Sequence, residues 1–171
     1  SKNFLPDIVL IKLGTNDTKP QNWKDEKHFM EEYQTLIDTY RSLDSHPQVI
    51  LLTPVRCFLT EKNTISPRII EEKVRLVVEQ LAYDNGLGII NLHNLFGNQW
   101  DQVIMPDRLH PSSIGAGAMA RKIGDYLLNA VQSKPAAIVP ENATSFNFHG
   151  YQGYDFQLDG VPYKVVRPAK E

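Results

Sequence analysis

Two short polar segments contain residue types that could carry out acid–base chemistry. Asp107 lies three residues before His110, and Pro111 follows at the expected start of a helix. A carboxylate at this spacing can orient an imidazole so that the imidazole acts as a general base. Asn16 lies in residues 14–17 (GTND), directly after an apolar run, where its amide could donate to a developing oxyanion. Together these segments would form half of a hydrolase site.

The pattern of apolar residues predicts the elements that position these segments. Nearly continuous apolar runs, typical of strands buried on both faces, cover residues 7–13, 49–53 and 86–92. Apolar residues recur at helical spacing within residues 22–43, and Asn22 is the expected N-cap of this helix. A second helix should begin at Ser66-Pro67. Ser112 or Ser113 should cap a last helix. The expected inward residues of the three helices are Phe29, Met30, Tyr33, Leu36, Ile37 and Tyr40; Ile70, Val74, Val77 and Leu81; and Ile114, Met119, Ile123 and Leu127.

Strands and helices alternate, which favours an α/β domain with a parallel sheet. In such sheets ligands bind beyond the carboxyl ends of the strands, so we expect the polar loops to converge there. Arg56 follows the second strand and His93 follows the third. Each is a candidate substrate contact, although a surface ion pair for Arg56 and a structural role for His93 are alternatives.

A family resemblance rests on the same residues. Residues 13–17 (LGTND) resemble the third sequence block of SGNH/GDSL hydrolases, and residues 107–111 (DRLHP) resemble the fifth. The resemblance covers residues 7–131 and implies a flavodoxin-like, three-layer α/β/α fold. It also implies that His110 is the general base and that Asp107 orients it. Asn16 would stabilise the oxyanion, and Gly14 would allow the sharp turn and line the substrate site.

The chain departs from this family at its start. The family's first block, which carries the nucleophilic serine, and its second block, which carries an oxyanion glycine, have no counterpart in this sequence. The strand at residues 7–13 would then have an unpaired apolar edge. We therefore expect a missing N-terminal segment to carry the serine and cover this edge, and we expect residues 1–171 alone to be inactive.

These observations predict a serine-type ester hydrolase whose substrate is an O-acylated carbohydrate or another small ester. The alternative is a non-catalytic module that binds a ligand or partner on an SGNH-like fold. No cofactor is implied, and no cluster of histidine and cysteine has the spacing of a metal site. The sequence fixes no compartment, and a periplasmic or secreted location is compatible with it.

Composition excludes several other classes. The 171 residues are 42% hydrophobic and 22% charged, which is typical of a globular domain. A net charge of -2 without a basic stripe makes nucleic acid an unsuitable partner. The apolar runs are too short to cross a membrane. The single cysteine, Cys57, cannot form an internal disulfide.

The C-terminal residues differ in character from the rest. Residues 132–145 are rich in proline and small residues and predict a linker. Residues 146–171 predict a β-hairpin, with strands at 154–158 and 161–166 around an Asp159-Gly160 turn. Such a hairpin must dock on the domain or open a second one, because two strands alone have marginal stability.

Overall fold

The computed structural model describes residues 5–60, 65–97, 100–132, 144–148, 151–158 and 161–168. They divide into two compact units, Ser1–Leu127 and Leu128–Glu171, each of which is described by itself.

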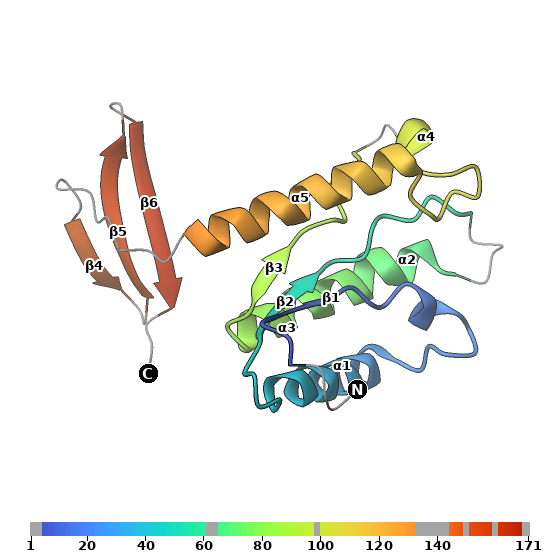
Figure 1. Cartoon of the computed structure of the whole chain (residues 1–171), viewed down its shortest axis with the longest axis horizontal. Coiled ribbons are helices and arrows are strands. Elements are labelled where there is room, and N and C mark those ends of the chain that lie inside the picture. Colours follow the sequence, from blue (N-terminus) through green and yellow to red (C-terminus); the bar gives the residue numbers. More distant parts are fainter. Residues whose placement is uncertain are drawn as a thin grey trace. The chain divides into compact units, whose positions relative to one another are not determined.

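A parallel sheet lies at the centre of the first unit (Figure 1). Its order is β1 (Ile8–Ile11), β2 (Gln48–Leu52) and β3 (Gly88–Ile90). Ile8 lies opposite Gln48 in the first pair, and Leu52 lies opposite Ile90 in the second. β2 is buried at every residue after Gln48, because the central strand is covered on both faces. β1 and β3 are shorter than the predicted runs 7–13 and 86–92 that contain them, and β2 is displaced by one residue from the predicted run 49–53.

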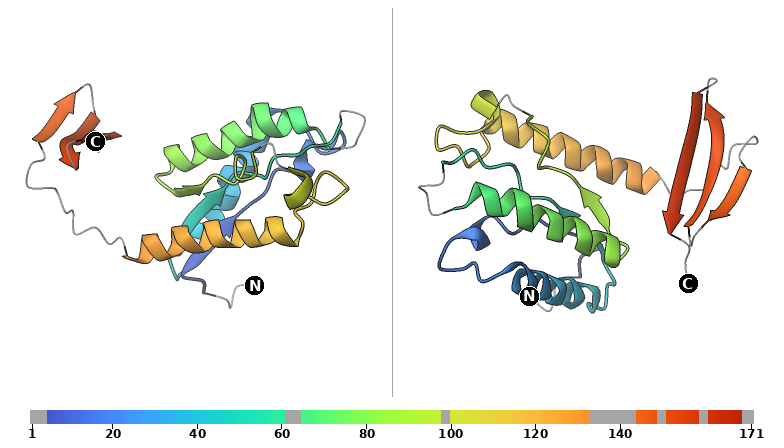
Figure 2. Two further views of the ribbon diagram at one scale, coloured as in Figure 1. Left: turned by 90° about the horizontal axis from the view of Figure 1, so that it is seen from above. Right: turned by 180° about the vertical axis from the view of Figure 1, so that it is seen from behind.

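Helices cover both faces of the sheet and form three layers. α1 (Glu26–Arg41) and α3 (Arg75–Asp84) pack on one face with Val49 and Leu51 of β2. α5 (Ser113–Gln132) packs on the other face against Ile50 and Leu52. The left view of Figure 2 shows α3 and α5 on opposite sides of the sheet. Alternate residues of β2 therefore belong to two separate cores.

The first helix begins later than the sequence suggests. Asp25 is its N-cap, and the Asp25 carboxylate accepts a hydrogen bond from the backbone N–H of His28 at 2.8 Å. The prediction of Asn22 as N-cap is wrong, because the chain makes a further turn in which Asn22 N–H donates to the carbonyl of Lys19. Buried Phe29, Tyr33 and Ile37 then place one face of α1 in the core.

The second helical segment contains a π-helical turn. α2 (Pro67–Ile69) is capped by Ser66, whose hydroxyl accepts from Ile69 N–H at 3.2 Å. The π-helical turn η2 (Ile70–Val74) follows and leads into α3. Ile70 and Val74 are fully buried. Their burial agrees with the predicted face, although the change of helix type was not predicted.

The last helix begins as predicted but packs differently in its first turn. The Ser112 hydroxyl accepts from Gly115 N–H at 3.2 Å, which identifies Ser112 as the cap. Ile114, expected to point inward, is 61% exposed. Gly115 instead faces the preceding short helix α4 (Trp100–Val103), where an added Cβ would overlap the carbonyl oxygen of Val103. The close approach at Gly115 turns Ile114 outward.

The second unit contains an antiparallel sheet in the order β4 (Thr144–Phe148), β5 (Tyr151–Leu158) and β6 (Val161–Pro168). β5 and β6 form the predicted hairpin, with Leu158 opposite Val161. The predicted Asp159-Gly160 turn lies outside the described residues. β4 was not predicted, and it begins at Thr144 within the segment expected to be a linker.

Candidate active site

One cleft brings together three segments that are far apart in the sequence. The turn after β1, the segment after β2 and the loop before α5 all contribute to its wall. Asn16 and His110 therefore line the same cleft, as expected from the convergence of loops at one sheet edge. The lining residues are Lys12, Leu13, Gly14, Thr15, Asn16, Asp17, Val55, Leu109, His110 and Pro111.

Gly14 makes the turn after β1 possible. Its φ of +111° is rarely adopted by residues that have a Cβ. An added Cβ would also overlap Cγ1 of Val74 and lie 3.2 Å from Cζ of Phe29. The conformation and the packing both require glycine, so a larger residue would displace the turn that carries Asn16.

Hydrogen bonds fix the backbone of Asn16 but, among the described residues, leave its side-chain amide free. The Asn16 carbonyl accepts from Lys19 N–H at 3.3 Å and from the Asn22 side-chain amide at 3.0 Å. Thr18 adds a bond from its hydroxyl to the Thr15 carbonyl at 2.9 Å. Within the described part of the chain, the Asn16 amide has no hydrogen-bond partner, so its N–H donors are available to a group in the cleft.

Asp107 and His110 form a hydrogen-bonded pair. Nδ1 of His110 lies 2.7 Å from Oδ2 of Asp107. Oδ1 of Asp107 accepts from the backbone N–H of Leu109 at 2.9 Å and of His110 at 3.0 Å. Because Nδ1 faces a carboxylate, it carries the proton, and Nε2 is left as a basic lone pair. The expected pairing of the two residues is confirmed.

The Asp107 carboxylate is stabilised in its charged form. The backbone N–H of His110, then that of Leu109, and then the His110 ring lower the pKa of Asp107 from 3.8 to about 2. Asp107 is therefore ionised at any physiological pH. A permanent negative charge at Nδ1 is what an imidazole needs when it takes up a proton at Nε2.

The loop that carries this pair is held at several points. Met105 N–H donates to the His110 carbonyl at 2.7 Å, and the Ser112 hydroxyl donates to the Gln102 carbonyl at 2.9 Å. Arg108 lies in the left-handed region with φ of +59°, which costs roughly 1–2 kcal/mol for a residue with a Cβ. The loop therefore contains local strain that other contacts must offset.

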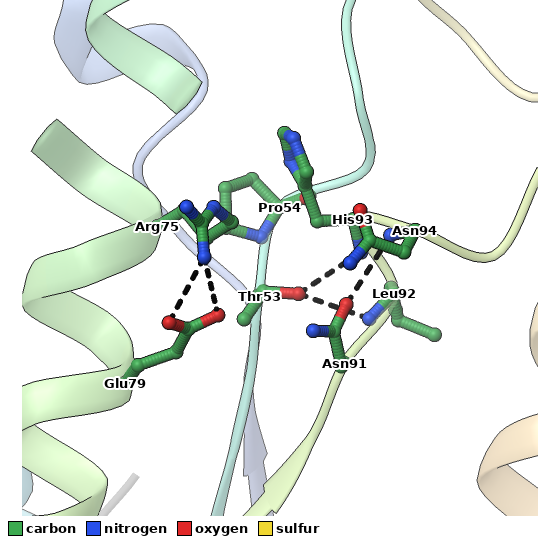
Figure 3. Close-up of polar contacts among 8 residues, drawn as sticks. All are labelled: Thr53, Pro54, Arg75, Glu79, Asn91, Leu92, His93 and Asn94. Carbon is green, nitrogen blue, oxygen red and sulfur yellow. Dashed lines mark hydrogen bonds and ion pairs between the residues drawn. The ribbon is translucent and has the colours of Figure 1, made fainter. Parts of the chain in front are cut away.

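Arg56 and His93 do not line the cleft. Arg56 pairs with Glu71 at 3.7 Å and lies over the ring of Phe58, with 5.8 Å from Cζ to the ring centroid. His93 is only 3% exposed, and its Nδ1 lies 3.2 Å from the Pro54 carbonyl (Figure 3). Both positions agree with the structural alternatives and leave the substrate-binding hypothesis for these two residues without geometric support.

His93 helps to join the ends of two strands. The Thr53 hydroxyl accepts from the backbone N–H groups of Leu92 at 2.9 Å and His93 at 3.0 Å (Figure 3). Desolvation by burial lowers the pKa of His93 below 6.5. A neutral, buried imidazole here stabilises the connection between β2 and β3.

Lys12 is a cleft residue that sequence reasoning missed. Val9 and Ile11 pack in the core shared with α1 and α3, so alternation along β1 places Lys12 with Ile8 and Leu10 on the other face. Desolvation lowers the pKa of Lys12. A charge inside the apolar run of residues 7–13 was the available signal. Val55, Leu109 and Pro111 were also missed, and each directly precedes or follows a residue that was singled out.

The described residues offer neither a metal site nor a membrane-spanning helix. No group of three or more His, Cys, Asp or Glu side chains could hold a metal ion within the described ranges. Among the helices that are described, none is long and apolar enough to cross a bilayer.

Comparison with known proteins identifies related sequences and folds. A family model described as GDSL-like Lipase/Acylhydrolase matches residues 1–118. An acetylxylan esterase from Xylanibacter ruminicola is 33% identical over 137 residues, and the match covers 70% of this chain and 28% of that protein. The chain thus spans little more than a quarter of that relative's length.

Solved structures share the fold. A lipase/acylhydrolase from Enterococcus faecalis matches with a TM-score of 0.63 and 24% identity, over 73% of this chain and 63% of that one. A carbohydrate esterase family 3 protein from Talaromyces cellulolyticus matches with a TM-score of 0.60 and 22% identity, over 77% and 61% of the two chains. These similarities confirm the predicted flavodoxin-like α/β/α fold.

Proposed function

This chain belongs to the family of GDSL-like lipases and acylhydrolases, and we propose that it supplies the acid–base and oxyanion groups of a serine ester hydrolase. The substrate we propose is an O-acylated, most simply O-acetylated, carbohydrate. The observation that carries the proposal is the Asp107–His110 hydrogen bond of 2.7 Å, in a loop that lines one cleft with Asn16.

In the proposed reaction, His110 acts first as a base and then as an acid, and Asn16 stabilises the oxyanion in between. Nε2 of His110 takes the proton of a serine hydroxyl, and the serine oxygen attacks the ester carbonyl carbon. The Asn16 amide donates to the resulting oxyanion. The carbon–oxygen bond to the alcohol then breaks, and His110 returns the proton to that alcohol. Water, activated by His110, hydrolyses the acyl-enzyme in the same way.

We infer that the serine lies outside residues 1–171. The cleft lining includes a threonine, Thr15, but no serine among the residues that the structure describes. Cys57 is buried, and burial raises the pKa of its thiol, so it does not form a thiolate nucleophile. A catalytic serine must approach Nε2 of His110 from the open side of the cleft.

The proposed position of that serine agrees with the free edge of the sheet. β1 pairs with β2 alone in the described part of the chain. Its residues Ile8 and Leu10 are 38% and 40% exposed, and the neighbouring Leu13 is 50% exposed. Such apolar side chains favour coverage by further polypeptide, which could carry the serine alongside β1 to the cleft.

Carbohydrate esters are favoured by the named relatives. The curated relative is an acetylxylan esterase, and one structural match is a carbohydrate esterase. A non-catalytic binding module remains the alternative. A binding module would have no need for Asp107 to orient His110 in the same cleft as the Asn16 amide, which has no partner among the described residues.

Acetate release tests the proposal. The full-length gene product should release acetate from acetylated xylan, and its His110→Ala variant should be slower by at least about 10³-fold. An N-acetylated glycan serves as the control, because it presents an amide in place of the ester. A folded full-length protein that binds acetylated xylan and releases no acetate would favour the binding module.

A further inference from the structure

Arg108 stands between the two residues of the proposed acid–base pair. Its left-handed conformation, with φ of +59°, is unfavourable for a residue with a Cβ. The turn at Arg108 brings the N–H groups of Leu109 and His110 onto Oδ1 of Asp107. A change in the Arg108 backbone would therefore alter every contact that orients the His110 ring.

Arg108, Phe58 and Trp100 form a closed set of contacts that holds Arg108 in this conformation. The Arg108 carbonyl accepts from Phe58 N–H at 3.0 Å. The Phe58 ring stacks on the Trp100 ring, with centroids 5.6 Å apart and planes 24° apart. The Arg108 guanidinium lies over the Trp100 ring at 5.2 Å from its centroid. Each of the three residues contacts the other two, so none can move without disturbing both partners.

The set is also attached to the body of the domain. Phe58 and Trp100 both pack against the core that contains β2, β3 and α5. Arg56 lies over the Phe58 ring and pairs with Glu71 of η2. The loop carrying Asp107 and His110 is thereby joined to three distant parts of the chain through side chains that do not line the cleft.

We propose that Arg108 and Trp100, with Phe58, are positioning residues that hold the Asp107–His110 pair in its productive geometry. The inference rests on the proposed function for its kinetic consequences. Arg108 needs this support because it has no ion-pair partner within the described ranges, while its backbone is strained. The contact with Trp100 places the delocalised charge of the guanidinium over the ring, and the compact ammonium of a lysine would not reproduce it.

Substitutions at Trp100 separate positioning from charge, because they leave Arg108 in place. In the full-length gene product, Trp100→Ala should lower kcat about tenfold while KM changes less than about twofold. Trp100→Phe keeps a ring and should restore kcat to within about twofold of the native value. Tyr40→Ala is the matched control. It removes a half-buried aromatic ring from α1 and should lower Tm without changing kcat.

A readout that needs no substrate accompanies the kinetics. The Nδ1–H proton of His110, hydrogen-bonded to Asp107, should give a downfield proton NMR signal that is absent from Asp107→Asn. Trp100→Ala should broaden or shift this signal upfield, while Trp100→Phe and Tyr40→Ala should leave it in place.

The outcomes separate this inference from the proposed function. An unchanged His110 signal in Trp100→Ala, or a kcat loss that Trp100→Phe does not rescue, would overturn the positioning role. If the native protein has no esterase activity but Trp100→Ala still changes the His110 signal, the result would support positioning and contradict the proposed function.

Discussion

His110 lies in the loop before α5 and His93 lies in the segment after β3, and the surroundings of the two side chains differ. The His110 side chain is 68% exposed, and its Nδ1 bonds a carboxylate. His93 is 3% exposed, and its Nδ1 bonds a backbone carbonyl. Burial lowers the pKa of His93 and favours its neutral ring, whereas the Asp107 carboxylate beside the exposed His110 ring can orient that ring and stabilise its cation. The partner and the open face distinguish a base from a structural histidine.

Replacing each histidine by alanine should give the largest difference between the two sites. In the full-length gene product, His110→Ala should lower kcat/KM by at least about 10³-fold with little change in Tm. His93→Ala should instead lower the free energy of unfolding by about 2 kcal/mol, because it leaves a cavity and an unbonded carbonyl. Esterase assays and thermal melts of both variants provide the test. A loss of kcat in folded His93→Ala equal to that of His110→Ala would make the distinction wrong.

The Asp107 carboxylate should account for much of the difference in function between His110 and His93. Asp107→Asn should lower kcat by about 10² to 10⁴-fold, because the amide no longer stabilises the imidazolium and can favour the wrong tautomer. The pH–rate profile sharpens the test. With its folded pKa near 2, below 3.8, Asp107 contributes stability that is present above pH 3.8 and lost as pH falls through about 2. Asp107 protonation should therefore not limit kcat/KM anywhere above pH 5.

Asn16 should have a smaller effect than either member of the pair. Asn16→Ala removes one donor to the oxyanion and should lower kcat by about 10²-fold with KM nearly unchanged. Asn129→Ala, an exposed asparagine of α5, is the matched control and should retain native kcat. A rise in KM at constant kcat would mean that Asn16 binds the ground state and not the oxyanion.

The smallest expected effect concerns the protonation of His93. Because burial lowers its folded pKa below 6.5, its contribution to stability is full above pH 6.5 and is lost as pH falls through the folded value. Between pH 7 and pH 5, His93→Asn should reduce the acid-induced fall in Tm by about 2–4 °C relative to the native protein. Equal slopes of Tm against pH would show that His93 does not titrate in this way.

The sequence predicts where the helices and strands lie better than it predicts helix caps and the exposure of single side chains. Buried apolar runs locate β1, β2 and β3, and helical spacing locates α1, α3 and α5, because burial on two faces leaves a strong periodic signal. The cap of α1 and the exposure of Ile114 could not be predicted. They depend on a local turn at Lys19 and on how closely Gly115 approaches the carbonyl of Val103.

The candidate site was predictable only where spacing determines geometry. Asp107 and His110 are three residues apart in one loop, so their contact follows from local chain geometry. Asn16 joins them because parallel strands end at a common edge. Arg56 and His93 also follow strands, but their side chains point to Glu71 and Pro54, and no sequence pattern encodes that choice.

Labelling by a fluorophosphonate tests the central claim most directly. The full-length gene product should be labelled once, on a serine outside residues 1–171, and His110→Ala should be labelled far more slowly. Residues 1–171 alone should not be labelled, because the chain would supply the base and oxyanion donor without the nucleophile. Peptide mapping by mass spectrometry gives the position. A stoichiometric adduct on any residue within 1–171, or labelling that is independent of His110, would contradict the account.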